Sequence, residues 1–362
     1  GEETINQIKD RIDRLKIKNQ NIFIASNASL ESILDFIRKN NFKLVLLFTL
    51  FLLIIIFSLK ESYASNATIA YRSNISGGTD VPKIREWNST GIGSFNGEVI
   101  LPNASSADTS AAGLRYLTLR YSPVSSKRIL VTLGADGYLD AWVCRRFCNS
   151  SSSWAVSENI GSVWAAGSEA AQRRFDVEFE TKSGDAIVIY SANATSGSTD
   201  LAYKVLPADN DTFTSGMVEN SIDDPSSTAD IQYTWVEAAR NPFVNSEEMI
   251  IIGFDSNGND INAWVWNGTN FSDNNELTAA AGATSARKAI SVAYPGNTSS
   301  CANCTAALAV SGDGNSGNVV GRLWTGSAWI TVILGDLASG TDDVQWLQLK
   351  SSPIKLEGKV LL

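Results

Sequence analysis

The sequence contains no histidine among its 362 residues and only four cysteines. Histidine is the commonest general base and the commonest side-chain metal ligand. Its absence excludes Ser-His and Cys-His nucleophile systems and every histidine metal site. No other cluster that specifies a catalytic mechanism stands out. We therefore expect a protein that is not an enzyme and that has no cofactor.

Basic charge is also scarce, because 29 Lys and Arg face 38 Asp and Glu and give a formal net charge of −9. The segment before Phe42 is nearly balanced, with seven basic and six acidic residues, so most of the negative charge belongs to the rest of the chain. Proteins that bind nucleic acid need a basic surface. We expect no nucleic-acid partner.

The four cysteines form two close pairs, Cys144 with Cys148 and Cys301 with Cys304. In an oxidising compartment such pairs form short disulfide loops. The alternative is a four-thiolate zinc site, which would have to bridge more than 150 residues between the pairs. A redox CxxC motif normally precedes a helix, but the segment after Cys304 is strand-like. The pairs predict two disulfides.

One long apolar run, Leu44 to Leu59, has sixteen residues without a charge and lies between two lysines. A membrane-spanning helix needs about 17–25 apolar residues, and flanking lysines extend a shorter run. The run predicts a transmembrane helix over 43–60, with membrane lipid as its partner. More basic residues precede the run than follow it, which places the N-terminus in the cytoplasm and the remainder outside.

The segment before this run has a helical spacing of apolar residues, at Ile5, Ile8, Ile12 and Leu15. It predicts an amphipathic helix that either self-associates, or binds other surface proteins, or lies on the membrane. Ser29 is placed to cap a second helix. Ser62 to Ala64 also resembles a signal-peptidase site, and processing after Ala64 is the alternative to a retained anchor.

Asn-x-Ser/Thr triplets gather after the apolar run, with only Asn27 before it. They are acceptors for N-linked glycans in extracytoplasmic proteins, although loops rich in serine and threonine also produce such triplets without function. Together with the anchor they predict a glycosylated domain at the cell surface. The candidate sites are Asn66, Asn74, Asn88, Asn103, Asn149, Asn193, Asn210, Asn267, Asn270, Asn297 and Asn303.

From about residue 66 onward the chain repeats itself in two series of short apolar strands. The first series is centred on Arg85, Trp142, Tyr203, Trp264 and Arg322, with steps of 57, 61, 61 and 58 residues. The second is centred on Tyr116, Phe175, Tyr233, Ala289 and Trp346, with steps of 59, 58, 56 and 57 residues. A period of this length, built from short strands and polar turns, predicts the blades of a β-propeller.

Each repeat divides into four strands, for example 114–121, 127–134, 138–147 and 153–158 in the first complete unit. Strands over 83–88 and 96–101 have no first strand before them, and 343–350 has no later strands after it. Pairing them makes a fifth blade that joins the chain ends, although 67–72 and 358–362 both fit its second position. We predict an all-β propeller of five four-stranded blades. The expected domains are a helical segment 1–42, a transmembrane helix 43–60, a linker with a first strand 61–82, and a propeller 83–362.

Three segments carry a resemblance to a known family: SGDAIVIYS with LAYKV, DINAWVWNGTNF, and VVGRLWTGSAW. They resemble the repeats of β-propeller proteins on microbial, including archaeal, cell surfaces. In this chain Trp264, Trp266, Trp324 and Trp329 stand at the aromatic positions of those repeats, which are structural there. Tyr203 replaces a tryptophan. The resemblance implies a fold and leaves the activity open.

Three groups of residues are candidate sites. Asp255, Asn257, Asn259 and Asp260 have the alternate spacing of calcium ligands, and they also fit an ordinary hairpin turn. Arg115, Arg173, Arg174 and Arg287 stand at the start of successive first strands, where they are placed to converge on an anionic ligand or to remain solvated. Asp176, Glu178 and Glu180 alternate along one strand face, which could supply a catalytic pair of carboxylates, although charged residues on an exposed strand face are commoner. Sialidases carry Ser-x-Asp-x-Gly-x-Thr-Trp boxes, and none of these boxes occurs in this sequence.

Two functions follow from these observations. The first is a structural, adhesive or assembly subunit of the cell surface, carried on a membrane anchor. The alternative is a carbohydrate-binding module or a sialidase-like propeller that acts on glycans. The composition does not decide between them.

Overall fold

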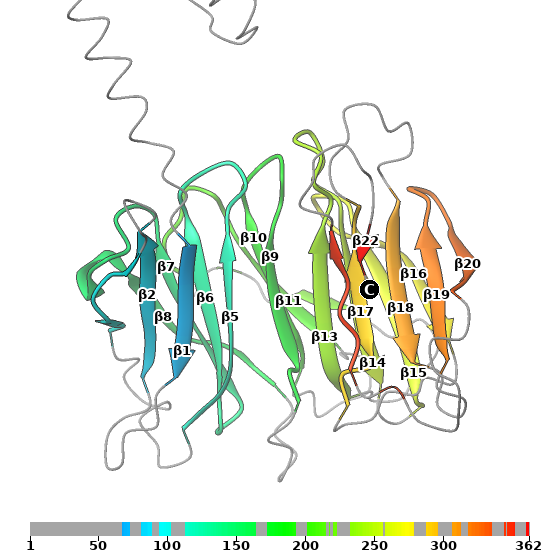
Figure 1. Ribbon diagram of the computed structural model, residues 1–362, viewed down its shortest axis with the longest axis horizontal. Coiled ribbons are helices and arrows are strands. Elements are labelled where there is room, and N and C mark those ends of the chain that lie inside the picture. Colours follow the sequence, from blue (N-terminus) through cyan, green and yellow to red (C-terminus); the bar gives the residue numbers. More distant parts are fainter. Residues whose placement is uncertain are drawn as a thin grey trace, which may run out of the picture. The chain divides into compact units, whose positions relative to one another are not determined.

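The computed structural model describes residues 67–72, 81–88, 94–102, 113–163, 172–192, 201–214, 217, 220–222, 232–255, 258–278, 287–295, 306–312, 318–334, 344, 346–351 and 360–361 (Figure 1). The chain divides into two units, Gly1–Ser65 and Asn66–Leu362, and the described residues belong to the second. Apart from one 3-10 turn, Ser151–Ser153, their regular structure is entirely β. No helix within these ranges is long and apolar enough to cross a membrane. The predicted N-terminal helices and the span from Leu44 to Leu59 lie outside them.

The strands form six antiparallel sheets, which we number 1 to 6 in chain order. Sheets 2 to 5 each take four consecutive strands in sequence order. Their strands are β5 (Leu114–Tyr121), β6 (Arg128–Gly134), β7 (Tyr138–Cys144) and β8 (Ala155–Ser162); β9 (Phe175–Phe179), β10 (Ala186–Ser191), β11 (Leu201–Leu206) and β12 (Asn220–Ile222); β13 (Tyr233–Arg240), β14 (Met249–Asp255), β15 (Asp260–Trp266) and β16 (Phe271–Thr278); and β17 (Ile290–Ala293), β18 (Ala307–Gly312), β19 (Val319–Trp324) and β20 (Trp329–Ile333).

The first and last sheets are smaller, and they overturn the prediction of five blades. Sheet 1 contains β1 (Ala67–Arg72), β2 (Pro82–Asn88), β3 (Ser94–Phe95) and β4 (Val99–Ile100), whereas sheet 6 contains β21 (Lys350–Ser351) and β22 (Val360–Leu361). The expected fifth blade combined both chain ends. β1 pairs with Pro82 to Trp87 of β2, which is the second position that the prediction allowed for 67–72, but no strand from 343–350 joins it. The latter segment lies beside sheet 5, where Trp346 forms a parallel bridge with Lys288.

Consecutive sheets pack face to face, and their first strands lie next to one another from β5 through β9 and β13 to β17. This is the blade arrangement of a β-propeller, in which the first strand of each blade is innermost. Each interface has an apolar core. Representative pairs across the five interfaces are Ile84 and Leu130, Val131 and Val177, Ile187 and Ile251, Ile250 and Val292, and Val310 and Leu347.

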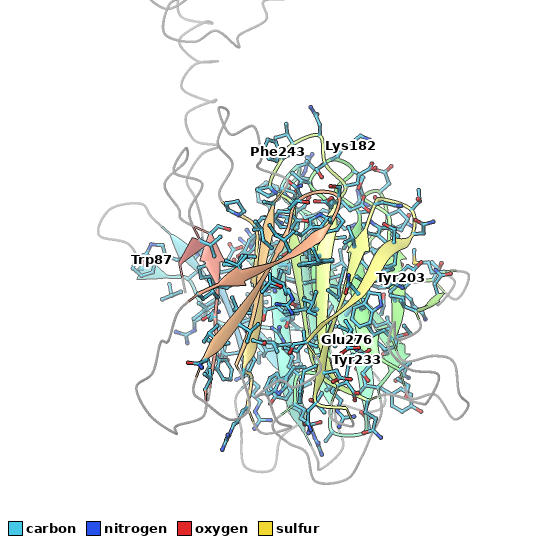
Figure 2. The ribbon with its side chains drawn as sticks, turned by 90° about the vertical axis from the view of Figure 1, so that its right-hand side faces the viewer. Trp87, Lys182, Tyr203, Tyr233, Phe243 and Glu276 are labelled. Carbon is cyan, nitrogen blue, oxygen red and sulfur yellow. A yellow bond between two sulfur atoms is a disulfide. The ribbon has the colours of Figure 1, made fainter. Side chains whose placement is uncertain are left out.

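The sequence alternates in the way that this packing requires. In β9, Phe175, Val177 and Phe179 belong to the core between sheets 2 and 3, while the acidic residues between them point the other way. β14 is buried along its whole length, because neighbouring sheets cover both of its faces. Figure 2 shows Tyr233 inside the packed body, and Lys182 and Phe243 in turns at one end of the strands.

One strand of the expected layout is misplaced. The repeat predicts a fourth strand at 212–218, but sheet 3 ends with β12 instead. Phe213 leaves the sheet, donates its backbone N–H to Ser157 Oγ in β8 at 2.8 Å, and packs against the core between sheets 2 and 3. A contact with the neighbouring blade thus outweighs local strand propensity.

The Cys144–Cys148 disulfide is present, with an S–S distance of 2.04 Å, and the second cysteine pair lies outside the described residues. Of the candidate glycosylation sites, Asn149, Asn267 and Asn270 are exposed and Asn210 is half-buried, all in turns. The other sequon side chains lie outside the part of the chain described here. Glycosylation therefore stays a prediction.

Replacing both Cys144 and Cys148 with serine is expected to lower the free energy of unfolding by roughly 2 kcal/mol, because the closed loop is short and constrains the unfolded chain only modestly. Urea titration of the double variant beside the parent protein, with and without reductant, measures the difference. The parent protein in reductant is the matched control. Equal midpoints for parent and variant under oxidising conditions would contradict the expectation.

Candidate functional site

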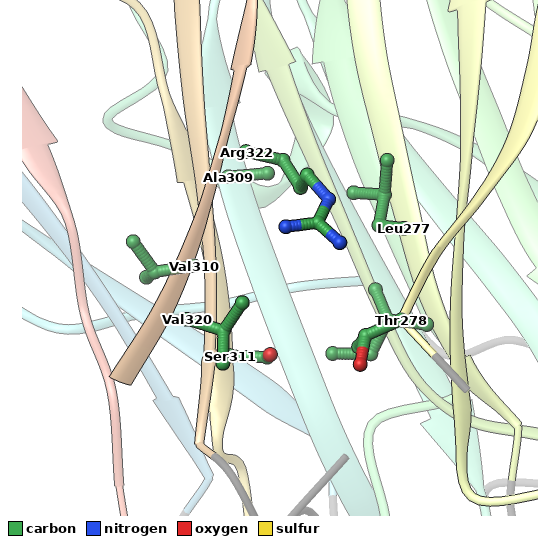
Figure 3. Close-up of a pocket in the computed structure, with 8 residues that line it drawn as sticks. Leu277, Thr278, Ala309, Val310, Ser311, Val320 and Arg322 are labelled. Carbon is green, nitrogen blue, oxygen red and sulfur yellow. The ribbon is translucent and has the colours of Figure 1, made fainter. Parts of the chain in front are cut away.

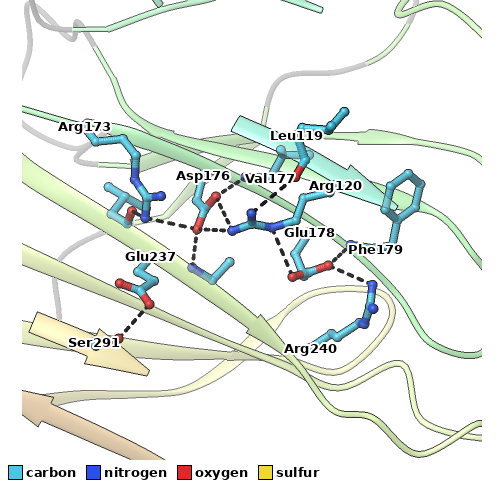
Figure 4. A network of polar contacts seen from close by, with 12 residues as sticks. Leu119, Arg120, Arg173, Asp176, Val177, Glu178, Phe179, Glu237, Arg240 and Ser291 are labelled. Atoms are coloured by element: carbon cyan, nitrogen blue, oxygen red, sulfur yellow. Dashed lines mark hydrogen bonds and ion pairs between the residues drawn. The ribbon is translucent and has the colours of Figure 1, made fainter. Parts of the chain in front are cut away.

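The first strands of sheets 2, 3 and 4, which lie next to one another, carry charged side chains that contact the neighbouring sheets. Arg120 comes from β5, Asp176 and Glu178 from β9, and Glu237 and Arg240 from β13. Within each strand they alternate with apolar residues that fill the cores between sheets. Figure 4 shows Arg120, Asp176, Glu178 and Arg240 joined in a series by ion pairs and hydrogen bonds, with Glu237 beside them bonded separately to Ser291.

Asp176 is the fully buried centre of this series. Its carboxylate accepts hydrogen bonds from Arg120 Nη2 at 3.1 Å, from Arg173 Nη2 at 3.3 Å, and from the backbone N–H groups of Val177 at 2.9 Å and Ala238 at 3.0 Å. Burial alone raises the pKa of a carboxyl group. Here the two arginines and the two N–H groups outweigh it, so the pKa of Asp176 lies below its ordinary value.

Glu178 is also buried but shows the opposite balance. Its carboxylate is 3.3 Å from Arg120 Nε and accepts hydrogen bonds from Arg240 Nη1 at 3.1 Å and the N–H of Phe179 at 2.9 Å. Burial dominates over both arginines and raises the pKa of Glu178. Arg240 also donates to the carbonyl of Tyr121 at 2.9 Å, so its guanidinium links three sheets.

Glu237 continues the series toward sheet 5. It accepts a hydrogen bond from Ser291 Oγ at 2.8 Å and forms an ion pair with Lys288 Nζ at 2.5 Å. Burial lowers the pKa of Lys288, and the neighbouring Glu237 opposes this effect. The backbone carbonyl of Lys288 accepts from Leu347 N at 2.9 Å, which fixes the C-terminal segment beside this layer.

A cavity of about 390 Å3 lies at one end of the series, and we call it the axial cavity. Its wall combines four charged residues of the inner strands with Tyr294, Lys350 and apolar side chains. Lys182 and Phe243 mark the turns that follow β9 and β13, and Figure 2 places both turns at this same end of the strands. The residues that carry the argument below are Arg120, Glu178, Glu237, Arg240, Tyr294 and Lys350.

The opposite end of the inner strands carries three aromatic side chains and two cations, and we call it the aromatic mouth. Its residues are Tyr116, Arg173, Trp235, Lys288 and Trp346. The ring centroids of Tyr116 and Trp235 are 6.5 Å apart, and those of Trp235 and Trp346 are 6.1 Å apart. Lys288 Nζ lies 5.6 Å from the ring of Trp346. Burial raises the pKa of Tyr116, and the nearby charge of Arg173 opposes the shift.

The four arginines predicted from the sequence to gather at one mouth are placed differently from one another. Arg115 and Arg173 both lie close enough to Tyr116 to act on its pKa. Arg174 is buried and donates from Nε to Gln172 Oε1 at 2.8 Å. Arg287 is half-buried, one residue before Lys288.

The series of ion pairs includes residues that the sequence analysis did not single out. They are Arg120, Glu237, Arg240 and Lys288. The available signal is a charge inside an otherwise apolar first strand, as in RYLTLRY and YTWVEAAR. Such charges in a strand are usually solvated, and only the position of the strand next to the axis gives them another role.

The other candidates give no assembled site among the described residues. Asp255 Oδ2 accepts the backbone N–H of Gly258 at 2.8 Å, as in a turn, and Asn257 lies outside the described ranges, so calcium binding stays a prediction. No group of three or more acidic or cysteine residues suited to a metal occurs in the part of the chain described. Glu180 accepts from Trp266 Nε1 at 2.5 Å, whereas its neighbours Asp176 and Glu178 bind arginines.

Two further hollows are less suited to a ligand. The first, between sheets 4 and 5, holds about 10 Å3 among Leu277, Val320 and Arg322 (Figure 3), which is room for about one water. The second, of about 320 Å3, lies between sheet 1 and Asn149, itself a candidate glycosylation site. A glycan on Asn149 would occupy its wall.

No family model matches the sequence, and no curated protein matches it. Several solved structures are similar in shape. The BP39L lectin from Burkholderia pseudomallei aligns at 13% identity over 75% of this chain and 67% of its own, with a TM-score of 0.49. The GH93 α-L-arabinofuranosidase of Fusarium graminearum, in complex with arabinobiose, aligns at 11% identity over 80% of this chain and 82% of its own, with a TM-score of 0.47. The six-bladed β-propeller lectin of Aleuria aurantia aligns at 12% identity over 80% of this chain and 86% of its own, with a TM-score of 0.40. At these levels the ligands of those proteins are not transferred to this chain.

Proposed function

We propose that this protein binds carbohydrate, and that the axial cavity is the binding site. The observation that carries the proposal is the wall of that cavity. Arg120 and Arg240 supply hydrogen-bond donors, and Glu178 and Glu237 supply acceptors, all on rigid neighbouring strands. Sugar hydroxyl groups both donate and accept, so they fit a wall that interleaves the two kinds of group.

The size and the remaining lining of the cavity agree with this proposal. A volume of about 390 Å3 falls in the range of small-molecule sites, roughly 300–1,000 Å3. The half-buried side chains of Ala239 and Pro242 add apolar surface, which the C–H face of a sugar needs. Since Arg120, Glu178, Glu237 and Arg240 each have a partner within the protein, this part of the wall is held in place before a ligand arrives.

We also propose that the carbohydrate-binding domain stands outside the cell on a membrane anchor. Its support is the apolar run from Leu44 to Leu59, the sequons that follow it, and the Cys144–Cys148 disulfide, since disulfides persist in oxidising compartments. In this setting glycan binding would serve adhesion or assembly at the cell surface.

The test uses the 362-residue chain in mild detergent and saturation-transfer NMR with a panel of neutral hexoses, pentoses and their disaccharides. We expect binding by at least one sugar, and affinity at least tenfold lower in Arg240→Gln and in Lys350→Gln. Lys350 is exposed, so its replacement leaves the fold intact. Arg145→Gln removes an arginine of sheet 2 that pairs with Asp211 away from the axis, and is the matched control. Binding by no sugar, or binding unaffected in both cavity variants, would refute the proposal.

A further inference from the structure

The aromatic mouth has an arrangement that the axial cavity does not explain. Its three aromatic residues come from alternate sheets, Tyr116 from sheet 2, Trp235 from sheet 4, and Trp346 from the segment that leads into sheet 6. The sheets in between contribute cations, Arg173 just before β9 and Lys288 just before β17. Aromatic and cationic side chains therefore alternate around one end of the axis.

One aromatic ring of this mouth is open to a ligand. Trp346 is 61% exposed, whereas Trp235 beside it is buried at 4%. The two rings meet edge to face, with planes at 78°, so Trp235 supports Trp346 while most of the Trp346 side chain stays exposed beside Lys288. An exposed indole on a fixed support is a stacking platform for the apolar face of a sugar ring.

The positive charge of Arg173 at this mouth is only partly neutralised within the protein. The carboxylate of Asp176 is saturated by four donors, and that of Glu237 is held by Lys288 and Ser291. Arg173 donates from Nη2 to Asp176 and to a backbone carbonyl, but its buried Nε–H has no partner within the described residues. The Arg173 side chain is 19% exposed, so its positive charge is accessible to an anionic ligand at this mouth.

We infer that the aromatic mouth is a second subsite, and that it takes a carboxylated sugar such as a uronic acid residue. The sugar ring stacks on Trp346, and its carboxylate lies toward Arg173 and Arg115. The inference rests on the proposed function in that the ligand is a glycan, but none of these residues lines the axial cavity. An uncharged sugar can use only the stacking half of the subsite.

The test compares tri-galacturonic acid with its uncharged counterpart galactotriose, titrated calorimetrically into the 362-residue chain in detergent, with tryptophan fluorescence as a second readout. We expect the acid to bind at least tenfold tighter, to change the tryptophan emission, and to weaken with added salt. Trp346→Ala and Arg115→Gln should each lower its affinity at least tenfold. The matched controls are Phe147→Ala, an exposed aromatic residue on a loop of sheet 2, and Lys182→Gln, an exposed lysine in the β9–β10 turn.

The variants separate this inference from the proposed function. If Trp346→Ala and Arg115→Gln weaken the acid while Arg240→Gln and Lys350→Gln do not, the second subsite is supported whatever happens with neutral sugars. If the acid binds no better than galactotriose, or is lost only in the cavity variants, the inference is overturned and the axial cavity keeps its own test.

Discussion

Replacing Asp176 with asparagine is expected to lower the free energy of unfolding by about 3–5 kcal/mol, because it removes a fully buried negative charge that Arg120 and Arg173 share. The carboxylate is fully buried, and Arg120 and Arg173 both pair with it. Asparagine keeps the size of the side chain, so the loss comes from electrostatics and hydrogen bonding rather than from a cavity. Urea titration at neutral pH measures it.

The matched control for this variant is Asp211→Asn. Asp211 pairs with Arg145, but both side chains are more than a third exposed. A solvent-exposed ion pair contributes at most about 1 kcal/mol. If the two variants lose equal stability, the buried series of ion pairs is not a determinant of the fold.

The loss in Asp176→Asn should depend on pH. The pKa of Asp176 is lower in the folded than in the unfolded protein, so its contribution is complete above the unfolded pKa of about 4 and disappears as pH falls through the folded pKa. Parent and variant should therefore converge in stability toward acid pH. Burial raises the pKa of Glu178 in the folded protein, so its contribution to stability falls as pH rises above about 4. The stability of Glu178→Gln should therefore increase relative to that of the parent over this pH range.

The second large effect is expected for Trp264→Ala, at about 3–5 kcal/mol. Trp264 is fully buried in the core between sheets 3 and 4. Its ring meets that of Tyr233 edge to face, with centroids 5.2 Å apart. Gly253 leaves the space that the Tyr233 ring fills, since a Cβ there would collide with it. The close packing prevents the neighbours from filling the space that the indole vacates.

Trp346→Ala is the matched control for this loss, because it removes the same side chain from an exposed position, and it should cost less than about 1 kcal/mol. Chemical denaturation of both variants gives the comparison. A loss below about 1.5 kcal/mol for Trp264→Ala would show that the repeat tryptophans are not the structural residues that the resemblance to surface propellers implies.

Local pattern was enough to predict most of the blades. The period of the two series placed Tyr116, Phe175 and Tyr233 at equivalent positions, and all three lie in first strands, β5, β9 and β13. The alternation in RFDVEF places Phe175, Val177 and Phe179 on one face of the strand, and these three residues do share one core. These features follow from one strand at a time, because side chains alternate between the faces of any strand.

The axis and the chain ends were decided only by the tertiary structure. Arg120, Asp176 and Arg240 are about sixty residues apart from one to the next, and the local sequence marks each only as a charge within a largely apolar strand. Arg120 reaches Asp176, and Arg240 reaches Glu178 beside it, because three blades bring their first strands together. The aromatic mouth arises in the same way from alternate sheets. The five-blade prediction failed for a related reason. The prediction joined 343–350 to the strands near the other chain end, but Lys350–Ser351 pairs with Val360–Leu361 in a sheet of its own, and only 67–72 takes the position beside β2.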